Sequence, residues 1–145
     1  MVAIMKAAAG FVIYKKSCDA ILYLLLQTSY GEHHWTPPKG HVDPGETEMT
    51  TAIRETVEES GLKKGDLKIY EDVKRILNYK VNGKPKVVTY WLAELVNPQA
   101  KVKLSEEHQD YKWLNIDEAC VYGKYPDLQE ALKYFDNYIR SNKLN

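Results

Sequence analysis

Alternating apolar runs and polar segments along the chain predict five strands. They cover residues 6–14, 20–28, 68–80, 86–96 and a short segment around 111–114. The second run is almost continuously apolar, which is typical of a strand covered on both faces. Asn82-Gly83 separates the third and fourth runs, and this dipeptide between two β-rich runs predicts a hairpin.

Helical periodicity appears twice. A helix is predicted over residues 47–60, with Gly61 in the left-handed conformation that ends it. A second helix starts near Pro126 and places these apolar residues on one stripe: Leu128, Ala131, Leu132, Phe135 and Ile139. Residues 31–45, rich in Gly, Pro and His, and residues 105–110 are predicted to be loops. Together these elements predict an α/β fold with a mixed β-sheet sandwiched between α-helices.

Length and composition narrow the class of protein. The 145 residues fit a single domain spanning residues 1–145. Lys and Arg together number 20, as do Asp and Glu, so a net charge of zero gives no overall attraction to nucleic acid or membranes. The only two cysteines favour a reducing compartment. No apolar run reaches the roughly 18 residues of a membrane span, and no signal peptide is recognisable. We therefore expect a cytoplasmic monomer with neither nucleic acid nor a membrane as partner.

The predicted helix over residues 47–60 carries an unusual glutamate cluster. At about 100° per residue, one arc gathers Glu48, Glu55, Glu58 and Glu59, and the core-facing stripe gathers Met49, Ala52, Ile53, Thr56 and Val57. Like charges at this spacing repel by about 0.2–0.5 kcal/mol per pair, and the last turn of a helix disfavours anions. The arc is either a solvated face or a site for a hard cation such as Mg²⁺ or Mn²⁺, and a cation removes both penalties.

A longer motif surrounds this cluster. The chain reproduces Gly-x5-Glu-x7-Arg-Glu-U-x-Glu-Glu-x-Gly-U, where U is a bulky aliphatic residue, with Gly40, Glu46, Arg54, Glu55, Glu58, Glu59, Gly61 and Leu62. Seven fixed residue types would coincide by chance on the order of once in 10⁸ positions at average residue usage. The segment resembles the box of the Nudix hydrolases. Thr56 departs from it at the first U position, which affects packing and leaves the carboxylates intact.

The resemblance implies the Nudix fold and hydrolysis of a nucleoside diphosphate linked to a further group. It implies that Glu55, Glu58 and Glu59 bind Mg²⁺, with Mn²⁺ as a substitute, and that Arg54 pairs with a carboxylate, for which Glu46 is the best candidate. The general base is either Glu55, whose basicity metal binding would reduce, or Glu107. We favour Glu107 as base or auxiliary metal ligand, with Glu106 as the alternative register.

Segments outside the box indicate a narrower group. Residues 33–46, 83–86, 90–93 and 104–108 resemble the animal-type asymmetrical diadenosine tetraphosphate hydrolases. This resemblance implies a dinucleoside polyphosphate substrate, split into ATP and AMP by water attacking a terminal phosphorus. It implies adenine stacking on Tyr79 and phosphate binding by Lys39, which also assists catalysis. The other substrate-binding candidates are His34, Trp35, His41, Lys84 and Lys86.

Structural interpretations stand beside these. Tyr79 and Trp35 could be packing residues, and Lys84 and Lys86 could be solvated hairpin lysines. Trp91 and Trp113 are expected to be structural, since both lie in strands among apolar residues. Capped RNA, ADP-ribose or diphosphoinositol polyphosphates are alternative substrates of a Nudix hydrolase, although zero net charge disfavours an RNA reader. A non-catalytic nucleotide sensor is the alternative outside enzymes.

Overall fold

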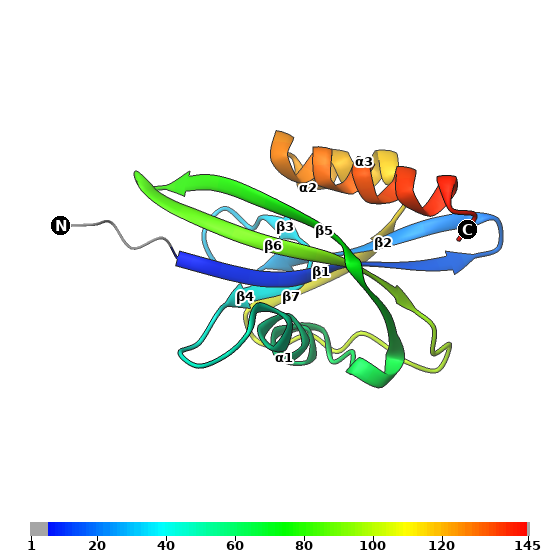
Figure 1. Cartoon of the computed structure of the whole chain (residues 1–145), viewed down its shortest axis with the longest axis horizontal. Coiled ribbons are helices and arrows are strands. Elements are labelled where there is room, and N and C mark those ends of the chain that lie inside the picture. The colour runs from blue at the N-terminus through cyan, green and yellow to red at the C-terminus, as the bar shows by residue number, and fades with distance from the viewer. Residues whose placement is uncertain (1–5, 145) are drawn as a thin grey trace.

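A computed structural model describes residues 6–144 and places their strands in one seven-stranded mixed sheet (Figure 1). The strands are β1 (Lys6–Ser17), β2 (Ala20–Thr28), β3 (Trp35–Thr36), β4 (Lys39–His41), β5 (Leu67–Val81), β6 (Lys84–Leu95) and β7 (His108–Leu114). They pair in the order β3-β2-β1-β6-β5, with β4 on β1 and β7 on β2. Only the β1–β6 pair is parallel among these strands. The predicted mixed sheet is therefore confirmed.

Helices cover both faces of the sheet. α1 (Glu48–Ser60) lies on one face, and α2 (Ile116–Gly123) with α3 (Pro126–Ser141) on the other (Figure 1). Alternate residues of β1 point to opposite faces of the sheet and belong to two hydrophobic cores. The core under α2 and α3 contains Ala8, Val12 and Tyr14. The core under α1 contains Ala9, Phe11 and Ile13. All five residues of the stripe predicted for the last helix are buried. The left ends of β1, β5 and β6 extend beyond α2 and α3, so part of that sheet face is uncovered (Figure 1).

Local interactions determine the ends of α1 and the turn of the β5–β6 hairpin. The Thr47 hydroxyl accepts a hydrogen bond of 3.1 Å from the Thr50 N–H at the start of α1. Gly61 ends the helix at φ 75°, as predicted. Asn82 and Gly83 both have positive φ angles, 52° and 76°, which match the predicted tight turn between β5 and β6.

Three predictions of local structure are wrong. Residues 31–45 are not all loop, because β3 and β4 form there by pairing with β2 and β1. β4 can approach β1 because Gly10 has no side chain. A Cβ at this position would collide with the Pro38 carbonyl oxygen. β7 starts at His108, inside the predicted loop 105–110. Helix α2 was not predicted, although Asn115 caps it by accepting a bond of 2.9 Å from the Glu118 N–H.

Other expectations for the scaffold agree with the structure. Trp91 is buried and Trp113 packs against the same core under α1, so both are structural. Cys18 and Cys120 are free thiols. Within residues 6–144, none of the helices combines the length and apolar character needed to traverse a bilayer.

Candidate active site

Helix α1 turns part of its glutamate cluster toward the sheet. Glu59 is 7% exposed, whereas Val57, predicted on the core-facing stripe, is 39% exposed. The predicted faces of this helix are therefore wrong at these two residues. Small side chains on the buried side of α1, including Ala52 and Thr56, let the helix lie close to β4. That close approach places Glu55 and Glu59 at the edge of the sheet.

Arg54 organises the carboxylates around it. Its Nε and Nη2 each donate a hydrogen bond of 2.8 Å to Glu46, so the predicted Arg54–Glu46 pair is confirmed. Its Nη1 donates 2.8 Å to Glu55 and 3.3 Å to Glu58. The Arg54 hydrogen bonds lower the pKa of Glu46 to about 2. One guanidinium thus ties the loop before α1 to two of the predicted metal ligands.

Glu59 is a buried carboxylate, and among residues 6–144 no lysine or arginine forms an ion pair with it. The backbone N–H of Lys39 donates 3.1 Å to its Oε1, and the His108 Nε2 lies 3.9 Å from the same oxygen. Burial raises the pKa of Glu59 to about 8, and burial lowers the pKa of both Lys39 and His108. Burial therefore makes the charged form of Glu59 costly, and a nearby cation would stabilise it.

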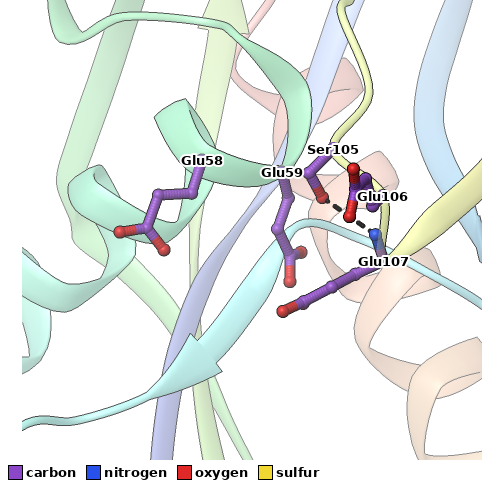
Figure 2. Close-up of a pocket in the computed structure, with 5 residues that line it drawn as sticks. All are labelled: Glu58, Glu59, Ser105, Glu106 and Glu107. Carbon is purple, nitrogen blue, oxygen red and sulfur yellow. Dashed lines mark hydrogen bonds between the residues drawn. The ribbon is translucent and has the colours of Figure 1, made fainter.

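A pocket of about 330 Å³ opens beside Glu59 and is lined by Glu58, Glu59, Ser105, Glu106 and Glu107 (Figure 2). Glu59 and Glu107 point toward one another in this view, whereas Glu58 points away. The Glu107 N–H donates 3.3 Å to the Ser105 hydroxyl, which fixes the loop. Burial is the largest cause that raises the pKa of Glu55 and of Glu59. The negative charge of Glu107 adds a smaller increase to the pKa of both residues. Geometry and charge therefore favour Glu107 over Glu106 as the group that faces the helix.

The donor chemistry around this pocket fits a hard divalent cation. Glu55, Glu58, Glu59 and Glu107 offer carboxylate oxygens only, the ligand type that Mg²⁺ and Mn²⁺ prefer. Across residues 6–144, however, no three acidic, His or Cys side chains already converge on one point. Arg54 pairs with Glu55 and Glu58, two of the predicted ligands. Their roles as ligands therefore stay predictions.

A group of aromatic side chains lies near β3 and α2. The rings of Trp35 and Tyr122 meet edge to face at 5.3 Å and 86°. His34 and Tyr125 also meet at 5.3 Å, with the Tyr125 hydroxyl 3.3 Å from His34 Nδ1. Both tyrosines are partly exposed, so these rings could accept a stacked base. We assigned Tyr122 and Tyr125 no role from sequence; aromatic residues just before the last helix were the only signal.

Most of the cationic candidates share one sheet face with Tyr79. Gly40 faces α1 and Glu55, so its neighbours Lys39 and His41 face the opposite side of the sheet. Lys86 pairs with Tyr79 across β5 and β6. Burial, followed by the charges of Lys86 and Lys39, lowers the pKa of His41. The structure therefore brings His41, Lys39 and Lys86 together.

Two further residues lie apart from that cationic group. Lys84 is exposed at the start of β6, two residues nearer the hairpin tip than Lys86. The Nδ1 of His33 lies 3.0 Å from the Thr28 carbonyl oxygen. His33 is therefore a structural residue of the loop.

Comparisons with known proteins agree with this site. The NUDIX domain model matches residues 5–137. A curated asymmetrical bis(5′-nucleosyl)-tetraphosphatase of Caenorhabditis elegans is 51% identical over 132 residues, covering 91% of this chain and 95% of the relative. The asymmetrical bis(5′-nucleosyl)-tetraphosphatase of Sus scrofa is 48% identical over 140 residues, covering 92% of this chain and 95% of the relative. A crystal structure of a C. elegans Ap4A hydrolase binary complex matches with a TM-score of 0.92 and 48% identity, covering 94% of this chain and 99% of the other. This chain therefore belongs to the Nudix family.

Proposed function

We propose that this protein hydrolyses P1,P4-bis(5′-adenosyl) tetraphosphate asymmetrically to ATP and AMP. The observation that carries the proposal is the 51% identity to an asymmetrical bis(5′-nucleosyl)-tetraphosphatase along 91% of the chain. The site supports it, because it holds carboxylates for phosphate chemistry, with Lys39 hydrogen-bonded to Glu59, and the chain also presents aromatic rings and lysines suited to a nucleotide. We take residues 1–145 as one catalytic domain that acts as a monomer in the cytoplasm, with neither nucleic acid nor membrane as partner.

Mg²⁺ is the expected cofactor, and Mn²⁺ a substitute. Glu55, Glu58 and Glu59 would hold it, because Glu58 and Glu59 line the pocket and Glu55 lies on the same helix. Glu107, which also lines the pocket, is the base in this proposal, and an auxiliary ligand is its alternative role. When bound, the cation neutralises charge on the phosphoryl oxygens and lowers the pKa of bound water. Arg54 orients two of these carboxylates through its bonds to Glu55 and Glu58.

Hydrolysis needs an attacking water, a base and stabilisation of the departing group. Glu107 takes a proton from water, whose oxygen bonds to the phosphorus next to one adenosine. The bond between that phosphorus and the oxygen bridging it to the next phosphorus breaks. The attacked phosphorus stays with its adenosine as AMP, and the other three phosphates leave with the second adenosine as ATP. Lys39 stabilises the negative charge that develops on the phosphate oxygens; its own N–H contact to Glu59 keeps it beside the carboxylates.

Aromatic and cationic residues position the substrate in this proposal. Tyr79 stacks on one adenine, and base stacking on an aromatic ring contributes roughly 1–3 kcal/mol. His34 and Trp35, each in contact with the ring of a tyrosine, offer further aromatic surface for the substrate. Lys84 and Lys86 supply positive charge along the sheet for the phosphate chain, and His41 supplies a ring N–H that can donate to a phosphate oxygen.

The decisive experiment is incubation with diadenosine tetraphosphate and Mg²⁺ in ¹⁸O-water, followed by chromatography and mass spectrometry. ATP plus AMP with the label on AMP is expected. Label on ATP would move the attack to another phosphorus, and two ADP would mean symmetrical cleavage. Binding without turnover would favour a nucleotide sensor instead, and turnover of capped RNA or ADP-ribose in preference would change the substrate.

A further inference from the structure

One row of side chains runs straight across three adjacent strands. Tyr79 on β5 pairs with Lys86 on β6, and Lys86 pairs with Lys6 on β1. Neighbouring strands lie about 4.8 Å apart, so the backbones of Tyr79 and Lys6 are separated by about 10 Å. The row therefore consists of an aromatic ring followed by two ammonium groups.

All three side chains lie on the same face of the sheet. Lys6 is two residues before Ala8, which faces the core under α2 and α3, and Lys86 is two residues before Val88, which does the same. Tyr79 packs partly against that core. The ends of β1, β5 and β6 extend beyond α2 and α3 (Figure 1). Lys6 is exposed, and Tyr79 and Lys86 are half-buried, so a ligand can reach all three side chains.

His41 joins the row from the other side of β1. It pairs with Ala8 and therefore shares the face of Lys6. A pocket of about 560 Å³ at the start of β1 is lined by Lys6, Ala7, His41, Val42, Asp43, Pro44, Gly45 and Glu46. Lys6 is close enough to His41 for its charge to help lower the pKa of His41, after burial and the charges of Lys86 and Lys39. Lys6 thus belongs to the cationic group described above.

Two lysines of this group, Lys6 and Lys86, are not paired with a carboxylate in the part of the chain that the structure describes. Within residues 6–144, neither Lys6 nor Lys86 forms an ion pair. The two carboxylates that line the pocket are engaged elsewhere, since Arg54 lies 3.3 Å from Asp43 and 2.8 Å from Glu46. Like charges held side by side across a sheet are unfavourable, and a polyanion removes that penalty.

We propose that Lys6 is a substrate-binding residue that holds the phosphates farther from the stacked base, continuing the row of Tyr79 and Lys86 toward the pocket at the start of β1. The proposal rests on the proposed function and deepens it. A chain of phosphates would extend from the ring at Tyr79 past Lys86 to Lys6, and the pocket beside His41 would receive the far end of the substrate. Lys6 then favours substrates with a longer phosphate chain.

Calorimetric binding of inorganic tripolyphosphate to the whole chain in the presence of Mg²⁺ tests Lys6 without requiring turnover. Lys6→Met keeps the apolar stem and removes the charge, so its affinity should fall about tenfold, the size of a lost hydrogen bond to a charged group. Lys6→Arg should bind like the unaltered chain. Lys74→Met, at an exposed lysine of β5, is the matched control and should change nothing. Equal affinity in Lys6→Met, or no binding by the unaltered chain, would overturn the proposal.

Kinetics with diadenosine tri-, tetra- and pentaphosphate add a readout that separates the two proposals. Lys6→Met should raise KM with kcat unchanged, and the effect should be larger for the tetra- and pentaphosphate than for the triphosphate. An equal loss with all three substrates would contradict selective contact with distal phosphates. If the unaltered chain turned over none of them, the proposed function would fail, and calorimetry would still decide whether Lys6 binds phosphate.

Discussion

The Glu55 carboxylate lies directly against the Cα of Gly40, in the position that a Cβ on that residue would take. The contact joins α1 to β4 and leaves Lys39 and His41 free to face the other side of the sheet. The glycine of the box is thus required by the carboxylate, and its own φ angle is not in the left-handed region. One backbone position therefore couples the carboxylate cluster to the sheet face that carries Lys39 and His41, the proposed substrate-binding residues.

Gly40→Ala should reduce kcat on the order of 10²-fold, because displacement of a catalytic group by about 1 Å costs that much. The added methyl group must displace Glu55 or separate α1 from β4. Steady-state kinetics with diadenosine tetraphosphate measures the loss. Gly65→Ala is the control, since a Cβ there meets no atom within 4 Å. Full activity in Gly40→Ala would mean that the exact position of Glu55 is unimportant.

The ion pair between Glu46 and Arg54 predicts a pH-dependent contribution to stability. The pKa of Glu46 is about 2 in the folded protein, below its ordinary value of 4.5. Because folding lowers this pKa, the ionised carboxylate stabilises the fold above about pH 4.5, and the stabilisation is lost as the pH falls toward 2. Glu46→Gln should therefore lower the Tm at neutral pH, and the difference should shrink on acidification.

Thermal unfolding of the unaltered chain and Glu46→Gln at several pH values provides the measurement. Asp43, Glu55 and Glu58 also face Arg54, so some loss with acid is expected in both proteins. Glu71→Gln, at an exposed residue of β5, should leave the Tm unchanged throughout. A Tm difference that did not depend on pH would rule out the ionised pair as its source.

Local signals predicted much of the scaffold, and long-range contacts account for what they missed. The ends of α1, the Asn82-Gly83 turn and the stripe of the last helix depend on neighbouring residues, and these predictions are confirmed. β4 depends on an approach to β1 that is permitted by Gly10, some thirty positions earlier in the chain. Such a contact has no local sequence pattern.

The same distinction holds for the candidate site. The box residues were recognisable by spacing, and the Arg54–Glu46 pair followed from it. The burial of Glu59 did not follow from the spacing. A helical wheel places glutamate on the polar face, and it contains no information about the backbone N–H of Lys39, which hydrogen-bonds the buried carboxylate. Tyr122 and Tyr125 come next to Trp35 and His34 only through the packing of α2 on β2 and β3.

Removal of divalent metal should abolish turnover, and Mg²⁺ or Mn²⁺ should restore it. Metal that binds only the folded state also stabilises it, by about 2.7 kcal/mol when the free metal exceeds its Kd about 100-fold. Mg²⁺ should therefore raise the Tm of the chelator-treated protein. Glu59→Gln should lose most of that rise, whereas Glu118→Gln, at an exposed residue of α2, should retain it. A rise of equal size in Glu59→Gln would remove Glu59 from the ligand set.

Tyr79→Ala should raise KM for diadenosine tetraphosphate about fivefold or more, because loss of one stacked base costs roughly 1–3 kcal/mol. Tyr79→Phe keeps the ring and should behave like the unaltered protein. Tyr79 also packs partly against the core under α2 and α3, so the Tm of both variants must be measured. A KM that is unchanged in Tyr79→Ala would mean that this ring packs the core and does not bind the base.

Glu107→Gln provides the sharpest test of the chemical step. Glu107 is exposed in the loop before β7, and its side chain points toward Glu59 across the pocket (Figure 2). The amide keeps the size of the side chain but cannot accept a proton, so kcat should fall about 10²- to 10⁴-fold while nucleotide binding stays nearly intact. Single-turnover kinetics and calorimetry with substrate measure the two effects separately.

Glu106→Gln is the matched control for Glu107→Gln, because both residues line the same pocket in adjacent positions. It should retain near-normal turnover, since the negative charge that acts on Glu55, Glu59 and Lys39 belongs to Glu107. If Glu106→Gln lost turnover and Glu107→Gln did not, the base would be one position earlier in the loop. Normal turnover in both variants would assign proton removal to a group on α1, with Glu55 the first to test.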